Sequence, residues 1–487
     1  MLAAMLATAS QARAPLPAVV AAGLAIGLLP PAWGAPAAAA LLLFVVGLAR
    51  PRLPLYLLGL AAPLASVREA RVGGVGVTVT ELLIFVALGA WLVGVAARND
   101  PPRVTPWVAP IGVFLLVGLP STGWALSLPA ALKELLRWVE LGVALVLAAA
   151  LIERPRQART LVAVLLIGGV GEALAGAVQF AFRIGPPSFA VGPFFRAYGT
   201  FGQPNPFGGY LEMVMPLALG LTYTAAAARF GGAAEPAAPA VAPAPAARRP
   251  WLLLLATLTL GATAAAMAMS LSRGAWLGAL VGLAAIMLAA GHRTTAAVLL
   301  ATFVGALIAL LGSFEVLPTW ASERLAGVSR FFGVFDVRQV LPNADNWGIV
   351  ERMAHWQAAY EMWLARPWLG MGIGQYAVAY PDFMLPGWKD PLGHAHNIYL
   401  NVLAEVGVPG LLAYLTIVLS WFVLAIRRLR GASTPLGSGL AIGVLGVLAA
   451  VSTHNMFDNL YVSGMNVHLG LLLGLLAGLP RWERVLD

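Results

Sequence analysis

The sequence predicts an all-α, polytopic membrane protein with about 12–14 transmembrane helices. Of its 487 residues, 60% are hydrophobic and only 10% are charged, whereas soluble domains carry about 25% charged residues. Apolar runs of roughly spanning length recur along the chain, and such runs usually cross membranes as helices. Basic residues gather in alternate loops between these runs, as in multi-pass membrane proteins.

Fourteen apolar segments give this prediction, and two of them are short, so the count ranges from twelve to fourteen. The approximate spans are 15–32, 35–49, 53–67, 76–97, 106–126, 129–152, 159–182, 205–228, 250–269, 273–291, 294–313, 397–426, 435–454 and 461–479.

The arginines indicate the orientation of these spans. The chain has 28 Arg and only two Lys. The basic clusters lie at 50–52, 98–103, 154–159, 229–249, 293, 427–430 and 481–484. All fall on one side, which the positive-inside rule makes cytoplasmic. Arg68 and Arg71, beside Glu69, are the exception on the outer side. Membrane orientation explains the net charge of +9 better than nucleic-acid binding, since the arginines are scattered over short loops.

This topology divides the chain into four regions. N-terminal transmembrane helices occupy 1–182, and central helices with Arg-bearing outer turns and a cytoplasmic Ala/Pro linker (230–249) occupy 183–313. A large outer loop with amphipathic helices follows over 314–396, and C-terminal helices over 397–487. A cleaved signal peptide at the start is disfavoured, because cleavage would upset the parity of the following helices. With no Cys, the chain has no disulfide, thiolate metal site or cysteine nucleophile.

The first unusual outer segment runs from Phe194 to Tyr210 and is rich in Gly, Pro and aromatic residues. Pro204 and Pro206 bracket Asn205 where a helix is expected to begin. A helix N-terminus favours an anion such as a diphosphate, and Arg196 can add a bidentate clamp. The alternative is that Arg196 only reaches toward lipid phosphates.

The second outer feature is the turn Ser270-Leu271-Ser272-Arg273-Gly274-Ala275 between two spans. Ser272 is suited to cap the next helix. Arg273 alone resembles a lipid anchor. A second Arg-bearing turn facing the same leaflet favours a shared anion site.

The outer loop contains an amphipathic helix over 347–363, in which Arg352 and His355 share part of a face. We expect it to lie over the membrane, as a structural lid or as part of an acceptor site. The glycines of 370–374 have loose nucleotide-loop spacing, but the preceding strand and the P-loop Lys are missing, so a nucleotide site is rejected.

The stretch His394-Ala-His-Asn-Ile-Tyr-Leu-Asn401 ends the outer loop and begins a span. An H-x-H pair needs further ligands to hold a metal; the candidates are His355, His454 and Asp458. Without Cys or a second motif of ligand spacing, a general base or proton shuttle is favoured and no metal is expected. A structural His396 that caps the helix is the alternative.

The ordered series G-T-F-G-Q-P-N (199–205), S-R-G (272–274) and H-N-I-Y-L-N-V-L-A-E-V-G-V-P-G (396–410) resembles the O-antigen ligase and O-antigen polymerase superfamily. The resemblance covers roughly residues 190–460, with the long periplasmic loop before the H-N-x-Y-L motif. It implies a C-type glycosyltransferase-like membrane fold and an inverting, metal-independent transferase without a cofactor, which takes a glycan from undecaprenyl diphosphate at the periplasmic face of the inner membrane.

The resemblance also implies roles for individual residues. Arg196 and Arg273 would hold the diphosphate, and His396 would act on the acceptor hydroxyl, although His394 leaves open which histidine does so. Glu405 is expected to orient partners. The proposed substrate-binding residues are Tyr198, Asn205, Arg352, His355, His394, Asn397, Tyr399 and Glu405.

Two family activities and one other class remain open from the sequence. A ligase would pass the glycan to lipid A–core or a similar acceptor, and a polymerase to another lipid-linked unit. A polyprenyl-lipid or polysaccharide transporter should place its polar groups at mid-membrane, whereas here they gather at one face. The expected partners are these lipid-linked substrates and membrane lipids, with no nucleic acid.

Overall fold

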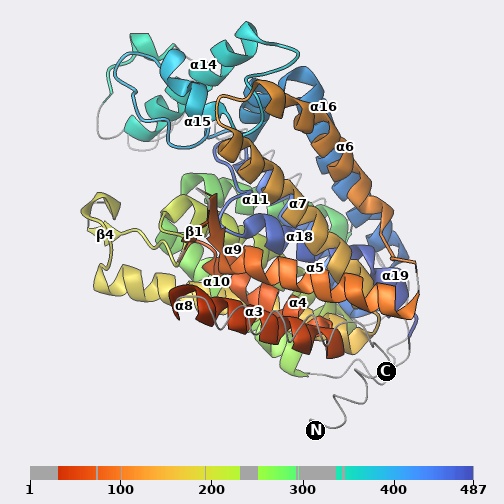
Figure 1. The fold of residues 1–487 in the computed structure, drawn as a ribbon. Coiled ribbons are helices and arrows are strands. Elements are labelled where there is room, and N and C mark those ends of the chain that lie inside the picture. The colour runs from red at the N-terminus through yellow and green to blue at the C-terminus, as the bar shows by residue number, and fades with distance from the viewer. Residues whose placement is uncertain are drawn as a thin grey trace, which may run out of the picture.

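The long apolar runs fold into helices, because a helix satisfies its backbone hydrogen bonds within the segment. The computed structural model describes residues 31–67, 69–72, 75–99, 101–191, 193–230, 250–291, 294, 336–342 and 346–485. Within these residues the fold is almost entirely helical (Figure 1). The prediction of an all-α polytopic membrane protein is confirmed.

The helices of the bundle follow the predicted spans closely. They are α3 (Pro31–Ala49), α4 (Arg52–Ala61), α5 (Val79–Arg98), α6 (Ala109–Gly118), α7 (Leu128–Leu151), α8 (Pro155–Phe182), α9 (Pro204–Phe230), α10 (Pro250–Ser270), α11 (Arg273–Ala290), α16 (Ile398–Gly431), α17 (Pro435–His454) and α18 (Met465–Ala477). The expected spans 15–32 and 294–313 and the linker 230–249 lie wholly or almost wholly outside the described residues.

Eight segments of the described chain are long and apolar enough to cross a membrane, and three shorter apolar helices accompany them. The helix α7 is 24 residues long but carries charged side chains in its first half, from Lys133 to Glu140. These charges explain why it is not among the eight, although it packs within the bundle.

One further helix of 19 residues and several short elements accompany the bundle helices. They are α14 (Trp347–Ala365), α15 (Tyr376–Ala379), α19 (Leu479–Trp482) and the 3₁₀ turns η1 (Ala62–Leu64), η2 (Pro106–Val108), η3 (Leu119–Trp124), η4 (Pro187–Phe189), η6 (Val337–Gln339) and η7 (Tyr380–Asp382). The amphipathic helix predicted over 347–363 is confirmed as α14.

Two small antiparallel hairpins were not predicted. The strand β1 (Glu69–Val72) pairs with β2 (Val75–Thr78), with Glu69 opposite Thr78. The strand β3 (Ala190–Val191) pairs with β4 (Phe194–Phe195), with Ala190 opposite Phe195. The second hairpin positions the chain that enters Arg196.

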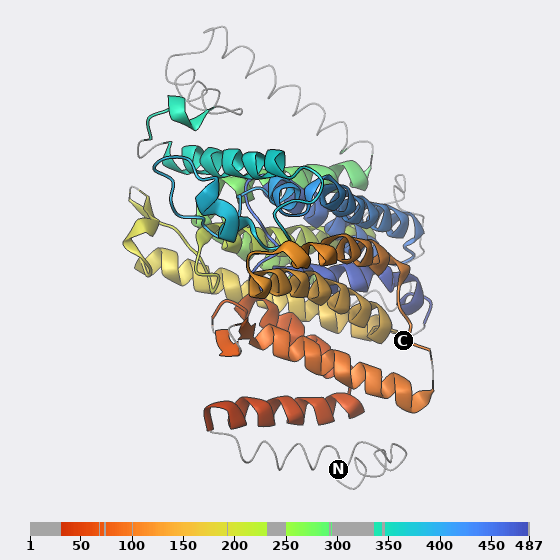
Figure 2. The ribbon, with the colours of Figure 1, turned by 45° about the horizontal axis from the view of Figure 1, so that its top comes forward.

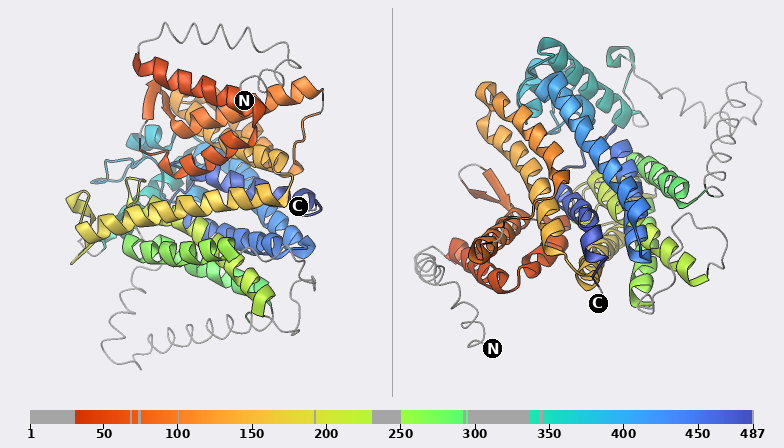
Figure 3. Two further views of the ribbon diagram at one scale, coloured as in Figure 1. Left: turned by 90° about the horizontal axis from the view of Figure 1, so that it is seen from below. Right: turned by 90° about the vertical axis from the view of Figure 1, so that its right-hand side faces the viewer.

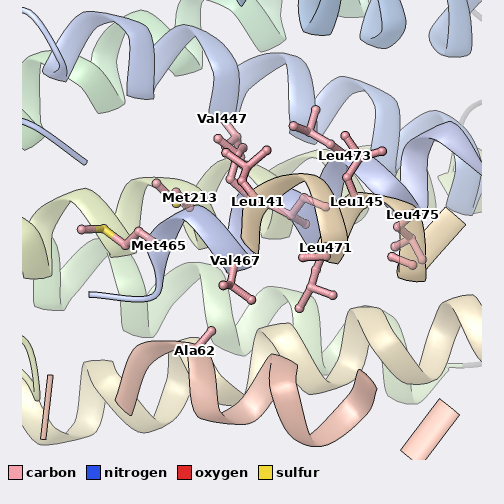
Figure 4. Close-up of a cluster of buried hydrophobic side chains, with 14 of the residues drawn as sticks. Ala62, Leu141, Leu145, Met213, Val447, Met465, Val467, Leu471, Leu473 and Leu475 are labelled. Atoms are coloured by element: carbon pink, nitrogen blue, oxygen red, sulfur yellow. The ribbon is translucent and has the colours of Figure 1, made fainter. Parts of the chain in front are cut away.

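Close helix packing rests on small residues, as is common between membrane helices. A Cβ on Gly470 of α18 would lie 2.5 Å from the carbonyl oxygen of Leu141 in α7, and one on Gly474 would lie 2.3 Å from that of Leu145. These glycines therefore let α18 approach the backbone of α7. Figure 4 shows the buried aliphatic side chains that fill the space around this contact.

The helix α16 is broken where the sequence predicted a single span. Gly407 has φ +69°, a left-handed conformation that favours glycine. The N–H of Val408 donates to the carbonyl of Pro367, 2.9 Å away. A Cβ on Gly407 would lie 2.5 Å from the carbonyl oxygen of Trp368. The break therefore lets the loop after α14 pack directly against the membrane helix.

The helices α14 and α15 lie at the end of the bundle away from the C-terminus (Figures 1 and 2), and two further views agree (Figure 3). Both small hairpins also lie away from the C-terminus. This end of the bundle gathers the polar residues considered next.

Candidate functional site

Arg196 follows β4 and joins the two Arg-bearing segments singled out in the sequence. Its Nε donates to the carbonyl of Ser270 and its Nη2 to Asn205 Oδ1, both at 3.0 Å. The same Asn205 oxygen accepts a hydrogen bond from Ser272 Oγ at 3.0 Å. Asn205 therefore ties the first turn of α9 to the turn between α10 and α11.

That turn presents Arg273 at the first position of α11. Ser272 caps the helix, as predicted, by accepting a hydrogen bond from the N–H of Ala275. Leu271 has φ +50°, which is unusual for a residue other than glycine. The hydrogen-bonded turn holds this conformation, and the side chain of Arg273 remains exposed.

Arg352 of α14 completes a group that we call the arginine cluster: Arg196, Arg273 and Arg352. Its Nε donates to the carbonyl of Phe457 at 3.0 Å and its Nη1 to that of Gly348 at 2.8 Å. Burial lowers the pKa of Arg196 to about 10, and the charges of Arg352 and Arg273 add to this effect. The three guanidinium groups are thus close enough to repel one another.

The partners of the arginine cluster are neutral. The hydrogen bonds of Arg196 and Arg352 go to carbonyl and amide oxygens. Among the described residues, no carboxylate forms an ion pair with the cluster, although Asp458 acts on Arg352 at longer range. A guanidinium has five N–H donors, so donors remain for an anion with several oxygens.

A second group, which we call the histidine cluster, consists of His394, His396 and Asp458. Asp458 Oδ1 lies 3.5 Å from both His394 Nε2 and His396 Nδ1. His394 Nδ1 accepts a hydrogen bond from the backbone N–H of His396, and the ring centroids are 4.4 Å apart. Neither ring nitrogen of His396 makes a hydrogen bond with the described residues, although both are buried.

The backbone fixes this arrangement. His396 has φ +50°, a strained conformation of a kind that is concentrated at functional sites. The next residue, Asn397, caps α16 by accepting from the N–H of Leu400. The N–H of Ile398 donates to the carbonyl of Asn455, 2.9 Å away. The start of α16 is therefore bonded to the loop that carries Asp458.

The charges of the histidine cluster are unequal. Burial raises the pKa of the Asp458 carboxyl, but His396 and His394 outweigh this effect and hold the pKa below its ordinary value. Burial lowers the pKa of His394 to about 4, although Asp458 opposes the shift. At neutral pH the cluster therefore contains an ionised carboxylate beside a neutral His394. A proton that arrives on His396 would be stabilised by that carboxylate.

His355 of α14 lies behind the histidine cluster. Its Nδ1 is 2.9 Å from Tyr376 Oη, and its ring stacks on Tyr380 with centroids 4.8 Å apart. The ring of His396 meets it edge-on at 5.8 Å. Burial and the charges of His396 and His394 lower the pKa of His355 to about 3. This neutral ring packs the wall of the site.

Four of the predicted substrate-binding residues make contacts within the fold, and their role in substrate binding stays a prediction. Asn397 caps a helix, and Tyr399 Oη donates to the carbonyl of Ser452. Tyr198 packs its ring edge-on against Phe189. Glu405 accepts the N–H groups of Gly374 and Tyr376 with its two carboxylate oxygens, which fixes the glycine-rich loop.

The histidine cluster also has the composition of a metal site. One ligand atom from each of its three residues lies within 4.8 Å of the others, and two His with one carboxylate can hold a divalent transition metal. The expectation of a metal-free site remains a prediction.

The sequence interpretation missed the part of Asp458 in this constellation, which it treated only as a possible metal ligand. It treated His454 in the same way, and it missed the buried polar partners of helices α9, α7 and α18, Glu212, Glu140 and Asn466. His454 Nδ1 lies 2.8 Å from Glu212 Oε1, and both side chains are buried. Asn466 Nδ2 donates to Glu140 Oε2 at 2.9 Å. The signal available was a lone carboxylate inside an apolar run, which is costly in lipid and therefore functional or paired.

Residues 258–415 match the family model described as O-Antigen ligase. The match covers about a third of the chain and supports the resemblance to the O-antigen ligase and O-antigen polymerase superfamily that the motifs indicate. No curated protein matches the chain.

The matched region runs from α10 into α16, inside the range where the motifs were recognised. It includes Arg273, Arg352 and both histidines of the histidine cluster, whereas Arg196 and Asp458 lie outside it. The hydrogen bonds of Arg196 and the contacts of Asp458 therefore connect the matched region to the rest of the bundle.

Proposed function

We propose that this protein is an O-antigen ligase, which transfers a glycan from undecaprenyl diphosphate to lipid A–core or a similar acceptor at the periplasmic face of the inner membrane. The observation that carries the proposal is the arginine cluster, which has no carboxylate in a direct ion pair among the described residues and lies beside the histidine cluster. One group is suited to hold a diphosphate, and the other to accept a proton.

The donor diphosphate would bind the arginine cluster. Arginine stays charged at physiological pH and matches phosphate oxygens with its planar fork. Arg196 and Arg352 are held by neutral oxygens, so their positions are fixed without a direct ion pair to a described carboxylate. Such preorganised charge stabilises a leaving group as its negative charge grows.

The transfer needs one bond to form and one to break. The acceptor hydroxyl oxygen attacks the anomeric carbon of the donor glycan from the side opposite the diphosphate. The bond from that carbon to the phosphate oxygen breaks, and undecaprenyl diphosphate leaves with the bonding electrons. The hydroxyl proton passes to His396, and the configuration at the anomeric carbon inverts.

Asp458 and His394 would position and assist His396. Asp458 Oδ1 lies 3.5 Å from His396 Nδ1, so the carboxylate can stabilise the imidazolium that forms and leave Nε2 for the acceptor hydroxyl. His394 Nδ1 accepts a hydrogen bond from the backbone N–H of His396. This bond helps to maintain the strained backbone conformation of His396, the proposed general base.

The choice of acceptor is tested with purified protein and a labelled lipid-linked glycan. The protein is offered lipid A–core in one reaction and a second lipid-linked unit in another. The proposal expects the label on lipid A–core. Label only on lengthened lipid-linked glycan would identify a polymerase, and no product from either acceptor would contradict both activities.

The proposed orientation is tested with single cysteines in this Cys-free chain. Leu341, 89% exposed, lies in the outer loop, and Ser433, also exposed, follows the basic end of α16. In intact spheroplasts an impermeant thiol reagent should label Leu341→Cys but not Ser433→Cys. The reverse pattern would place both clusters in the cytoplasm and exclude the proposed reaction.

A further inference from the structure

A cavity of about 470 Å³ opens beside the first turn of α14, away from the histidine cluster. Two tryptophans contribute to its wall, Trp347 and Trp388, whose ring centroids are 4.9 Å apart. Trp388 is almost completely buried, whereas Trp347 is 51% exposed. The size lies within the range of about 300–1,000 Å³ that is usual for small-molecule sites.

The polar groups around the cavity suit a sugar. The Trp347 Nε1 donates to Glu351 Oε1 at 3.3 Å, which orients the exposed ring. Arg338 contributes a guanidinium to the lining. A pyranose has an apolar C–H face that packs on the electron-rich face of an aromatic ring, and its hydroxyls can accept hydrogen bonds from a guanidinium.

The wall of the cavity is linked to the histidine cluster. Tyr380 Oη donates to the carbonyl of Trp388 at 2.9 Å, and the Tyr380 ring stacks on His355. His355 in turn meets the ring of His396. Along α14, Trp347 and His355 are eight residues apart, a rise of about 12 Å. An acceptor oligosaccharide with its reacting hydroxyl at His396 can span such a distance with a few sugar residues.

We propose that this cavity is a subsite for a sugar residue of the acceptor glycan, a few residues from the hydroxyl that reacts. The inference rests on the proposed glycan transfer. The subsite contributes to acceptor affinity and to the choice of glycan, while the arginine cluster holds the donor.

The test compares Trp347→Ala with Trp368→Ala. Trp368 is also exposed, at 68%, but lies in the loop after α14 and outside the cavity. Binding is measured by calorimetry with core oligosaccharide freed from lipid A by mild acid. We expect Trp347→Ala to weaken binding about tenfold, and Trp368→Ala to bind as the unaltered protein does. In transfer assays, Trp347→Ala should raise KM for the acceptor about tenfold and leave KM for the donor unchanged.

Binding that is unaffected by Trp347→Ala, or absent in the unaltered protein, would overturn the subsite. A further contrary result would come from tryptophan fluorescence in proteoliposomes with brominated lipids. If the lipids quench the unaltered protein more than Trp347→Ala, the Trp347 ring contacts lipid, and the cavity faces the membrane. Oligosaccharide binding that depends on Trp347 in a protein without transfer activity would retain the subsite and contradict the proposed reaction instead.

Discussion

The arginine cluster and the histidine cluster lie at the same end of the bundle, but their charges are balanced differently. Arg196 and Arg352 are held by carbonyl and amide oxygens and form no direct ion pair with a described carboxylate, although Asp458 acts on Arg352 at longer range. The histidines face the carboxylate of Asp458 within the fold. The difference is consistent with the proposal that the first cluster binds an anion, whereas the second has a carboxylate that can stabilise a protonated histidine.

The largest effect is expected from His396→Ala. Loss of a general base typically costs about 10²–10⁴-fold in rate, so kcat for glycan transfer should fall by that amount while donor binding is kept. His394→Ala is the matched control, because this ring contacts the same Asp458 oxygen but has a supporting role. It should lose much less activity.

An inactive His394→Ala with an active His396→Ala would reverse the two roles. Transfer that a chelator abolishes and a divalent ion restores would replace the proton-acceptor role of the histidine cluster with metal binding, for which its three residues are suitably close.

The next effect concerns the arginine cluster. Arg196→Ala and Arg273→Ala should each reduce transfer by about 10²-fold, the order expected when a preorganised donor to a growing negative charge is lost. Lysine should rescue poorly at either position, because an ammonium cannot reproduce the fork. Quantitative blotting of membrane fractions checks that each variant still inserts.

Full activity in Arg273→Ala would reduce that exposed residue to a lipid anchor. Arg183 serves as a control, because its side chain is also exposed, at the end of α8, and among the described residues it donates only to the carbonyl of Pro193. Arg183→Ala should transfer glycan at the normal rate.

A smaller effect is expected on the pH dependence of stability, which should depend on the buried histidines and not on the arginine cluster. Burial lowers the pKa of His355 to about 3 and of His394 to about 4, from an ordinary 6.5. The unfolded chain therefore binds more protons below about pH 6.5, and the protein should lose stability as the pH falls from 6.5 toward 4, by about 1–2 kcal/mol per ring at pH 5. The lowered pKa of Asp458 acts only at more acidic pH.

Thermal unfolding followed at pH 7 and pH 5 measures this effect. His355→Gln should reduce the difference in Tm between the two pH values, while Arg196→Ala should leave that difference unchanged. A pH dependence that is the same in His355→Gln as in the unaltered protein would show that this ring does not stay neutral in the fold.

Much of the fold was predictable, because apolar runs, helix caps and basic loops are local signals. The apolar runs correctly predicted the helices of the bundle, and Ser272 was correctly expected to cap α11. The hairpins were missed because strands of two to four residues carry little pattern. The break at Gly407 depends on the loop carbonyl of Trp368, which no local pattern reveals.

The site was predictable in its motifs but not in its partners. The sequence placed Arg196, Asn205 and Ser272 on the same side, and the structure joins them by hydrogen bonds. It could not show that Asp458, in a short loop 62 residues after His396, lies beside that ring. Glu405 was expected to orient partners, and the sequence could not show which ones: its two carboxylate oxygens accept backbone N–H groups of the glycine-rich loop.

The central claim is that the arginine cluster holds the donor while the histidine cluster removes the proton. The most direct measurement is binding of undecaprenyl diphosphate-linked glycan, without acceptor, to the unaltered protein, Arg196→Ala and His396→Ala, followed by turnover when acceptor is added. The account predicts that Arg196→Ala loses donor binding, whereas His396→Ala binds donor normally and fails to turn over. Normal donor binding by Arg196→Ala, or loss of donor binding in His396→Ala, would contradict it.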